Sequence, residues 1–292
     1  MEVGKGVYIK VFDESLMRKK VDVVICTKDR SHLLLDAVKQ ISSHVENIVV
    51  VESSGKPEWE VLASYPKELF NDLGLASKLH VHMTPNVKLG CARQVGLEKA
   101  VSDYVFFIDD DIILDKNCFV TMFKTLLSDP KIVAVSGRVV YGYASDKVLF
   151  KLYRSGNPPK RGGSGGLTVL DRKKVLELGG FNKDIHWGED MELCERVWNN
   201  GFKWVRERNA VGYHRCSFKE SLMRAKRNGE GFTVLWKYGT LSFFKSAMRL
   251  FARSFIMPIY YAISLFDPRV FVYYFLYCLM YLGAFLREMN RT

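Results

Sequence analysis

Residues 104–111 have the sequence YVFFIDDD, in which a run of five apolar residues is followed directly by three aspartates. Three further β-type runs precede it, at 21–26 (VDVVIC), 48–51 (IVVV) and, more weakly, 80–83 (HVHM). Between the first two of these, Leu34, Val38 and Ile41 have the spacing of one helix face. Strands that are apolar on both faces and alternate with helices are typical of a parallel sheet covered on both sides. The sequence therefore predicts an α/β domain of the nucleotide-binding type.

The composition supports a large folded domain and favours anionic partners. Hydrophobic residues make up 48% of the 292 residues and charged residues 26%, enough for a sizeable core without disulfides or metal staples. The net charge of +11 favours nucleic acid, a phosphate-bearing ligand or an acidic membrane surface, without choosing among them. The six cysteines form no CxxC pair and lie mostly in apolar runs, so we expect reduced core residues rather than a disulfide or zinc framework.

The two ends of the chain indicate a cytoplasmic protein attached to a membrane near its C-terminus. The first 20 residues carry charges throughout and contain no apolar stretch long enough for a signal peptide. Residues 254–266 and 270–286 are uncharged, rich in aromatic residues and separated by Asp267-Pro268. A spanning helix needs about 20 apolar residues, so we expect an embedded or interfacial hairpin at the cytoplasmic face of the cell membrane. The alternative is two buried helices packed on the domain. A basic cluster precedes these runs: Lys219, Arg224, Lys226 and Arg227.

The aspartates at 109–111 are the strongest local signal for chemistry. Three adjacent carboxylates repel one another, and each raises the pKa of its neighbours unless a cation is present. Mg²⁺ and Mn²⁺ resolve this repulsion because they prefer oxygen ligands, often carboxylates together with substrate phosphates. In open α/β sheets, ligands bind outside the carboxyl ends of strands, where this cluster falls. We therefore expect a divalent cation here, the alternative being a solvated acidic turn before a helix.

A second carboxylate pair, Glu189 and Asp190, precedes a helical pattern formed by Met191, Cys194 and Trp198. The pair therefore falls at a predicted helix N-terminus, where the macrodipole stabilises negative charge. A carboxylate that stays ionised can accept a proton from a hydroxyl, which makes this pair a candidate for general base catalysis. Helix capping without catalysis is the alternative.

Two polar positions at strand ends allow either a functional or a structural interpretation. His214 ends a short β-type run and could be a ligand or a hydrogen-bonded structural residue. The sequence ESSG at 52–55 ends the second run and could hydrogen-bond a nucleoside or form a simple turn.

Four segments, taken in order along the chain, resemble the family-2 glycosyltransferases, which have the GT-A fold. VVICTKDR at 23–30 resembles the opening strand and turn of that family, and IVVVESSG at 48–55 is similar to its second strand. NVKLGCARQVGLEKAVSDYVFFIDDD at 86–111 resembles the stretch that leads into the D-x-D motif. Residues 178–214, from LGGF to GYH, resemble the G-G-F segment, the E-D motif and a closing strand with its histidine. The resemblance covers roughly 21–214.

The resemblance implies inverting transfer of a sugar from a nucleotide-diphosphate sugar to an acceptor hydroxyl, assisted by Mn²⁺ or Mg²⁺. It implies a Rossmann-like GT-A catalytic domain at 1–238, followed by the apolar helical hairpin within 239–292. Matched residue by residue, the motifs imply donor nucleotide binding for Thr27, Asp29, Glu52, Arg93, Asp109 and Asp110, metal binding for Asp109, Asp111 and His214, acceptor positioning for Glu189, and the general base for Asp190.

Departures from the family pattern concern mainly the donor end of the site. Cys26 replaces the usual proline and Glu52-Ser53 an Asp-Asp pair, so the donor base is less defined than the fold. The Gly- and Pro-rich stretch at 154–166 should form a mobile loop, and its Lys160 and Arg161 could close over the donor phosphates.

Three alternatives remain beside this prediction. A polyprenyl-phosphate glycosyl synthase shares the fold and the acidic cluster, and the apolar tail favours it, but its acceptor is already anionic and needs no base. A non-catalytic sugar-nucleotide-binding membrane protein is disfavoured because all candidate catalytic carboxylates are present. A nucleic-acid binder is disfavoured because no base-reading motif occurs. The expected partners are a nucleotide-diphosphate sugar, a lipid-linked glycan or polysaccharide acceptor and an anionic membrane surface.

Overall fold

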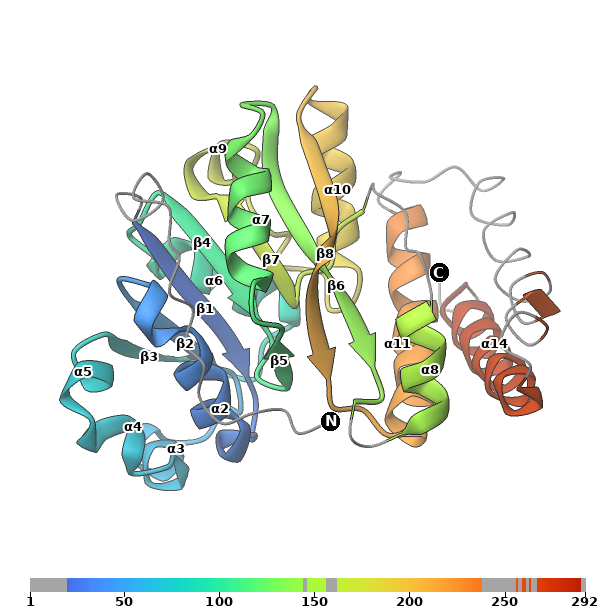
Figure 1. The fold of residues 1–292 in the computed structure, drawn as a ribbon, viewed down its shortest axis with the longest axis horizontal. Coiled ribbons are helices and arrows are strands. Elements are labelled where there is room, and N and C mark those ends of the chain that lie inside the picture. Colours follow the sequence, from blue (N-terminus) through green and yellow to red (C-terminus); the bar gives the residue numbers. More distant parts are fainter. Residues whose placement is uncertain are drawn as a thin grey trace.

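A computed structural model describes residues 20–143, 146–155, 162–237, 256, 259–260, 263 and 267–289. Its core is an eight-stranded sheet in the order β3-β2-β1-β4-β7-β6-β8-β5 (Figure 1). The strands are β1 (Val21–Thr27), β2 (Ile48–Glu52), β3 (Leu79–Met83), β4 (Tyr104–Ile108), β5 (Ile112–Leu114), β6 (Ile132–Tyr141), β7 (Leu167–Asp171) and β8 (Lys203–His214).

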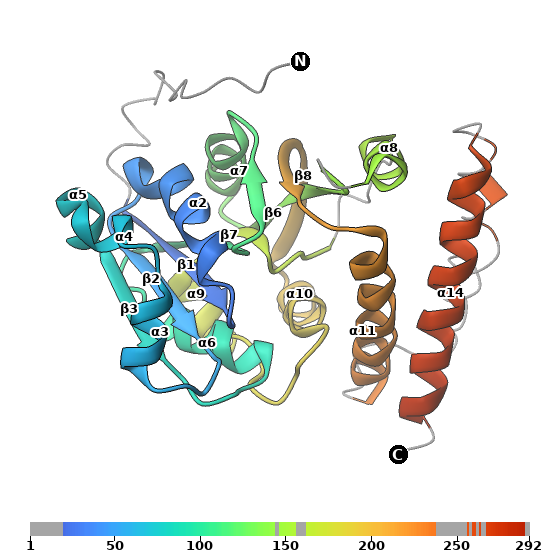
Figure 2. The same ribbon diagram turned by 90° about the horizontal axis from the view of Figure 1, so that it is seen from below.

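Helices cover both faces of this sheet (Figure 2). On one face α2 and α7 pack against strand residues such as Phe106, and on the other α6 and α10 pack against residues such as Phe107. This division follows from the strands, in which successive side chains point to opposite faces. The helices are α2 (Ser31–Ile41), α3 (Glu58–Ser64), α4 (Glu68–Asn71), α5 (Leu73–Ala76), α6 (Leu89–Lys99), α7 (Cys118–Leu127), α8 (Lys147–Ser155), α9 (Arg172–Glu177), α10 (Glu189–Asn199), α11 (Phe218–Lys237) and α14 (Pro268–Met289), with a 3₁₀ turn at Ser42–His44.

The sheet is parallel in one half and mixed in the other. The strands β3, β2, β1 and β4 pair in parallel, which confirms the predicted arrangement for this half. However, β7 is antiparallel to both β4 and β6, and β5 is antiparallel to β8, an arrangement that the apolar runs did not indicate. The reason is that burial on both faces makes a strand apolar whichever way it runs. Residues 167–170 of β7 are as fully buried as the first residues of β1.

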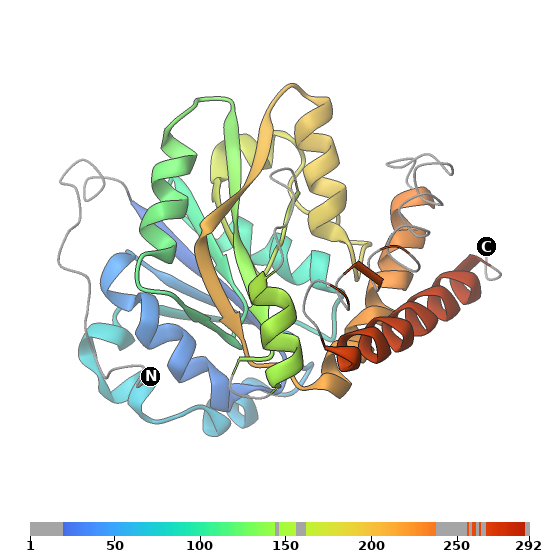
Figure 3. The same cartoon turned by 45° about the vertical axis from the view of Figure 1, so that its right-hand side comes forward.

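The C-terminal helix α14 packs along α11, and the two helices run in the same direction (Figures 2 and 3). Tyr273 of α14 is buried, and its hydroxyl lies 2.6 Å from Oγ of Ser221 on α11. Further along, an added Cβ at Gly229 of α11 would lie 2.3 Å from the carbonyl oxygen of Tyr281. One face of α14 is therefore fixed closely to α11.

The opposite face of α14 is exposed and apolar. It carries Phe271, Val272, Phe275, Leu276, Leu279 and Leu286. Among the described residues, α14 is the one helix whose length and composition would allow it to cross a membrane.

Parts of the predicted C-terminal and loop segments fall outside the described residues. The second apolar run, 270–286, lies within α14, but most of the first run, 254–266, is not described. The helical hairpin and the domain boundary at 238 therefore stay predictions. Arg154 belongs to α8, which corrects the predicted start of the loop at that residue, and Lys160 and Arg161 lie outside the described residues.

Candidate active site

A cavity of about 410 Å³ opens at the carboxyl ends of β1 and β4. These ends lie together because the two strands pair in parallel, with Val24 beside Phe107. The cavity is also lined by the N-terminus of α10, by residues 164–166 before β7, by the end of β8 and by one side of α11. This position, outside the carboxyl ends of neighbouring strands, is where open α/β sheets bind ligands.

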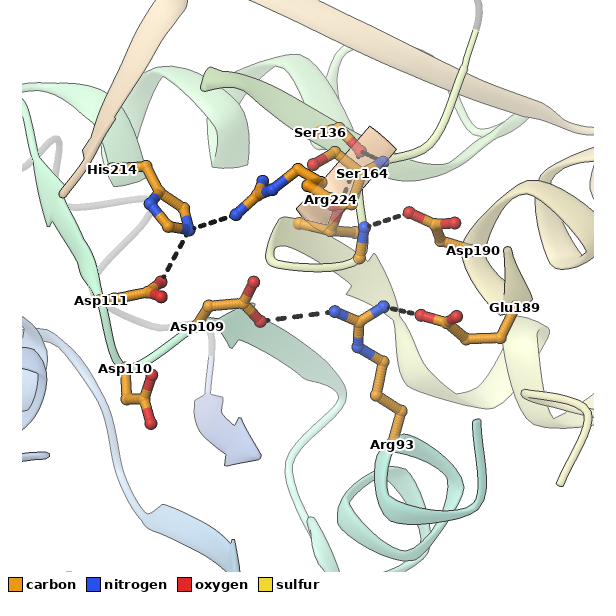
Figure 4. Close-up of polar contacts among 12 residues, drawn as sticks. Arg93, Asp109, Asp110, Asp111, Ser136, Ser164, Glu189, Asp190, His214 and Arg224 are labelled. Carbon is orange, nitrogen blue, oxygen red and sulfur yellow. Dashed lines mark hydrogen bonds and ion pairs between the residues drawn. The ribbon is translucent and has the colours of Figure 1, made fainter. Parts of the chain in front are cut away.

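The three aspartates after β4 differ in what they contact (Figure 4). Asp109 lines the cavity, and its Oδ1 lies 3.4 Å from Nη2 of Arg93. Asp110 is buried behind the cavity wall, accepts a hydrogen bond from Thr27 Oγ1 at 2.6 Å and pairs with Arg30 at 2.7 Å. Burial raises the pKa of Asp110 to about 7, although the charge of Arg30 opposes that shift.

Arg30 offsets part of the repulsion within the acidic trio. Its guanidinium bridges Asp110 and Asp111, with a nitrogen–oxygen distance of 2.7 Å to each. Nevertheless, Asp111 Oδ1 is buried, lies outside the contacts of Arg30 and accepts no hydrogen bond from the described residues. Since buried carboxylate oxygens without hydrogen bonds are costly, Arg30 alone compensates this cluster incompletely.

His214 approaches Asp111 from the end of β8 (Figure 4). Its Nδ1 lies 3.0 Å from the carbonyl oxygen of Arg215, which can only accept, so Nδ1 carries the proton. Burial lowers the pKa of His214 and the charge of Arg224 lowers it further, so the ring is neutral at pH 7. The single lone pair of Nε2 then accepts from Arg224 at 2.7 Å, and Nε2 lies 3.1 Å from Asp111 Oδ1; a cation bound here would replace Arg224 as the partner of that lone pair. Two electron-pair donors at this separation suit neighbouring ligands of one divalent cation.

Arg93 connects the aspartates to the second acidic segment. Its Nη1 forms an ion pair with Oε1 of Glu189, and its Nη2 faces Asp109. Burial alone would lower the pKa of Arg93, but the carboxylates of Glu189 and Asp109 outweigh it and raise that pKa, so the guanidinium stays charged. For Glu189, burial raises the pKa and Arg93 opposes the shift. The two acidic segments therefore meet at one cavity.

Asp190 is held by backbone donors at the start of α10. Its Oδ1 accepts from the amide of Met191 and its Oδ2 from the amide of Gly165, each at 2.8 Å. Gly188, the residue before α10, has a φ of +91°, which lies in the left-handed region that favours glycine. Two backbone donors therefore fix the Asp190 carboxylate at the helix N-terminus, facing the cavity.

The segment at 164–166 is itself anchored from the sheet. Ser136 Oγ on β6 accepts from the amide of Ser164 at 2.9 Å and from Nε1 of Trp204 at 2.8 Å (Figure 4). Gly165 passes so close to Arg93 that an added Cβ would lie 1.8 Å from its Nη1. The segment thus touches both the Arg93 ion pair and Asp190.

The predicted site residues divide into two groups in space. Seven line the cavity: Thr27, Arg93, Asp109, Asp111, Glu189, Asp190 and His214. The other three, Asp29, Glu52 and Asp110, lie outside this lining. Glu52 is buried and accepts from the amides of Asp29 and Ser54, so it organises the turns after β1 and β2. Asp29 is half-exposed, pairs with Lys56 at 2.9 Å and has a φ of +55°, which aspartate tolerates better than most residues.

Several residues of the cavity were not predicted as site residues. Arg30 stands in a quoted motif, but nothing in the sequence indicated that it bridges two aspartates. The basic cluster before the apolar runs divides: Arg224 and Arg227 line the cavity, whereas Lys226 pairs with Glu230 on the same helix at 4.0 Å. The spacing of the basic cluster could have indicated this division, because positions 224 and 227 lie three residues apart and share one helix face.

Sequence comparison identifies relatives of the chain. The family described as Glycosyl transferase family 2 matches residues 22–169. The O-antigen chain rhamnosyltransferase RfbN of Salmonella typhimurium strain LT2 is 25% identical over 219 residues. That alignment covers 67% of this chain and 66% of the relative.

Structural comparison finds the same fold in two solved transferases. The mannosyltransferase PcManGT of Pyrobaculum calidifontis, in complex with GDP-Man and Mn²⁺, superposes with a TM-score of 0.65 at 17% identity, over 94% of this chain and 88% of that one. GalNAc-T7, with UDP, GalNAc and Mn²⁺, superposes with a TM-score of 0.54 at 19% identity, over 70% of this chain and 45% of that one. The family match and the shared fold agree with the motifs, and the chain is a family-2 glycosyltransferase with the GT-A fold.

Proposed function

We propose that this glycosyltransferase moves a sugar from a nucleotide-diphosphate sugar to an acceptor hydroxyl with inversion at the anomeric carbon. The observation that carries the proposal is the meeting of two acidic segments at one cavity. Asp109 and Asp111 follow β4, Glu189 and Asp190 begin α10, and Arg93 lies between them.

Asp111 and His214 would hold a divalent cation, with Asp109 nearby. The fit rests on the buried Asp111 Oδ1, which accepts no hydrogen bond from the described residues, and on the His214 Nε2 lone pair 3.1 Å away. Among the described residues, no three His, Cys, Asp or Glu side chains form a complete metal site, so substrate phosphates would supply further ligands. When bound, such a cation neutralises charge that develops on a departing nucleoside diphosphate. Mn²⁺ is the first candidate, since both structural neighbours contain it.

The donor nucleotide would lie over the ends of β1 and β4. Thr27 and Asp109 line this part of the cavity, and Nη2 of Arg93 lies 3.4 Å from Oδ1 of Asp109. We assign Glu52, Asp29 and Asp110 to the donor end as well, where they shape the turns beside the nucleobase and ribose. The neighbours carry GDP-Man or UDP, and this chain would bind a donor of that class.

Asp190 would be the general base. Both of its oxygens accept backbone hydrogen bonds, which fix the carboxylate while leaving lone pairs for an incoming hydroxyl. As the acceptor oxygen attacks the anomeric carbon, its proton passes to Asp190, and the bond to the diphosphate oxygen breaks on the opposite side. Glu189, held by Arg93, would position the acceptor beside Asp190.

We further propose that the acceptor is a lipid-linked glycan or polysaccharide and that the protein acts at the cytoplasmic face of the cell membrane. The support is the exposed apolar face of α14 together with the basic residues of α11. A polyprenyl-phosphate glycosyl synthase is the second candidate, since it would share α14. Its acceptor would not need Asp190.

A donor screen tests these proposals. Purified protein is given a panel of nucleotide sugars with Mn²⁺ or Mg²⁺, and nucleoside diphosphate release is measured with lipid-linked sugars and with polyprenyl phosphate. We expect Asp190→Asn to abolish transfer to a hydroxyl while nucleotide affinity stays within about twofold. The exposed Asp184→Asn is the matched control and should retain transfer. Retained turnover in Asp190→Asn would remove Asp190 from the role of base.

A further inference from the structure

Helix α11 turns two arginines toward the cavity, Arg224 and Arg227, which lie about one helical turn apart. The guanidinium of Arg224 lies over the ring of Tyr141 at 4.2 Å, and that of Arg227 over the ring of Trp187 at 4.8 Å. An aromatic face holds a guanidinium in place while its N–H donors stay available to another partner. Both side chains are thus oriented by rings.

Arg227 has no ion-pair partner among the described residues. The nearest acid on its helix, Glu230, pairs with Lys226. Burial lowers the pKa of Arg227 and the like charges of Arg224 and Arg30 lower it further, while the carboxylates of Glu230 and Asp111 oppose this shift only in part. A guanidinium without an ion-pair partner at a cavity wall is suited to bind an anion.

Arg227 lies beside the segment that leads into α10 and Asp190, and the charges of Arg30 and Asp111 also act on it. Its ring partner Trp187 belongs to the segment that begins α10, and Gly231 of α11 packs against the carbonyl oxygen of Trp187. Arg224, in contrast, contacts His214, on the side where we place the cation and the donor diphosphate. An anion bound by Arg227 would therefore belong to the acceptor.

The same part of α11 is joined to α14. Asn228, next to Arg227 in the chain, lines the cavity and donates from Nδ2 to the Tyr277 hydroxyl of α14 at 2.7 Å. The other side of α14 is the exposed apolar face described above. A ligand with a phosphate group and a hydrocarbon chain would find a cation and an apolar surface on adjoining helices.

We propose that Arg227, placed on Trp187, binds a phosphate group of the acceptor, so that the acceptor is a glycan carried on a lipid phosphate or diphosphate. This inference rests on the proposed function, because the role of Asp190 defines the acceptor side. The lipid chain leaves the cavity past Asn228 and passes around α14 to its apolar face, which points away from α11. A guanidinium suits this task because its N–H donors match phosphate oxygens in pairs.

Vesicle binding by the full-length chain tests the inference. Phosphatidylcholine vesicles contain either a long-chain isoprenyl diphosphate or enough phosphatidylglycerol to match its charge, and cosedimentation gives the affinity for each. Wild-type protein should prefer the diphosphate vesicles about tenfold, as expected for a charge-assisted hydrogen bond. Arg227→Gln should lose this preference, whereas Lys226→Gln, which removes the same charge from a position beside Glu230, should keep it.

Calorimetry with GDP or UDP and Mn²⁺ separates the acceptor from the donor. Nucleotide affinity in Arg227→Gln should stay within about twofold of wild type. Weakened nucleotide binding would assign Arg227 to the donor and overturn the inference, whatever the vesicles show. Equal binding of both vesicle types by wild type, or an unchanged preference in Arg227→Gln, would also overturn it. A failure of the proposed function would be recognised differently. In that case wild-type protein would neither bind a nucleoside diphosphate nor release one from a nucleotide sugar.

Discussion

Arg93 and Glu189 form an ion pair across 96 positions of the chain, and their side chains are only 6% and 3% exposed. The arginine comes from α6 and the glutamate from the start of α10, so the pair fixes α10 relative to the strand ends. A buried pair of this kind adds little stability compared with apolar residues of similar size, but it is costly to break. Its contribution is therefore to position Asp190 and Asp109 at one cavity.

We predict that Arg93→Met destabilises the fold by about 3–5 kcal/mol, because Glu189 would be left buried without a compensating charge. The double variant Arg93→Met/Glu189→Leu should recover most of that loss without recovering transfer. Urea unfolding measures both. Lys203→Met removes a partner of Asp129 from an exposed pair and should cost about 1 kcal/mol or less. Equal losses in the buried and the exposed variant would contradict the prediction.

Gly165→Ala should reduce kcat/KM at least about tenfold. The added methyl group would lie 1.8 Å from Arg93 Nη1, so either Arg93 or the 164–166 segment must move, and the hydrogen bond from Gly165 to Asp190 is at risk. Gly283→Ala is the matched control, because a Cβ added there would have no atom of the described residues within 4 Å. Steady-state transfer assays compare the two, and full activity in Gly165→Ala would mean that the segment tolerates displacement.

Removal of divalent cations should weaken nucleoside diphosphate binding, and Asp111→Asn should remove most of the remaining cation dependence. The physical reason is that Asp111 Oδ1 is buried, accepts no hydrogen bond from the described residues and faces a histidine lone pair. Calorimetry with Mn²⁺ and with EDTA measures the effect. Asp36→Asn, at an exposed carboxylate on α2, is the control. Identical affinities with and without Mn²⁺ in wild type would refute the proposed cation site.

Cys26 should resist alkylation at pH 8 although it lines the cavity. Burial raises the pKa of its thiol to about 12, an effect that the charge of Arg93 only partly opposes. In an unfolded chain a cysteine ionises near pH 8.5, so the reactive thiolate should be abundant at that pH only after unfolding. Peptide mass spectrometry after iodoacetamide treatment, with a urea-unfolded control, measures modification at Cys26. Rapid labelling of the native protein at pH 8 would contradict this prediction.

The sequence predicted the parallel half of the sheet and the position of the acidic trio, because these depend on local patterns. The apolar runs at 21–26, 48–51 and 104–108 lie in β1, β2 and β4, which place the aspartates at strand ends. The direction of β7 could not be predicted, since apolar composition reports burial and carries no information on strand polarity.

The interaction partners of the charged residues could not be predicted from the sequence either. Each carboxylate segment left a structural alternative when taken alone, and only the family resemblance brought Asp109 and Asp190 into one site. The residues that connect them reach the cavity from distant elements: Arg30 follows β1, Arg93 lies on α6 and Arg224 on α11. Such contacts depend on tertiary packing rather than on spacing along the chain.

The close fit of α14 against α11 means that the C-terminal helix supports one wall of the cavity. A fragment that ended at residue 267 would lack the residues of α14 that contact Ser221 and Gly229 of α11, both of which are buried here. Since the other side of α11 carries Arg224, Arg227 and Asn228 into the cavity, such shortening would loosen one wall of the reaction chamber. Trimming the tail to improve solubility would therefore be expected to impair catalysis as well.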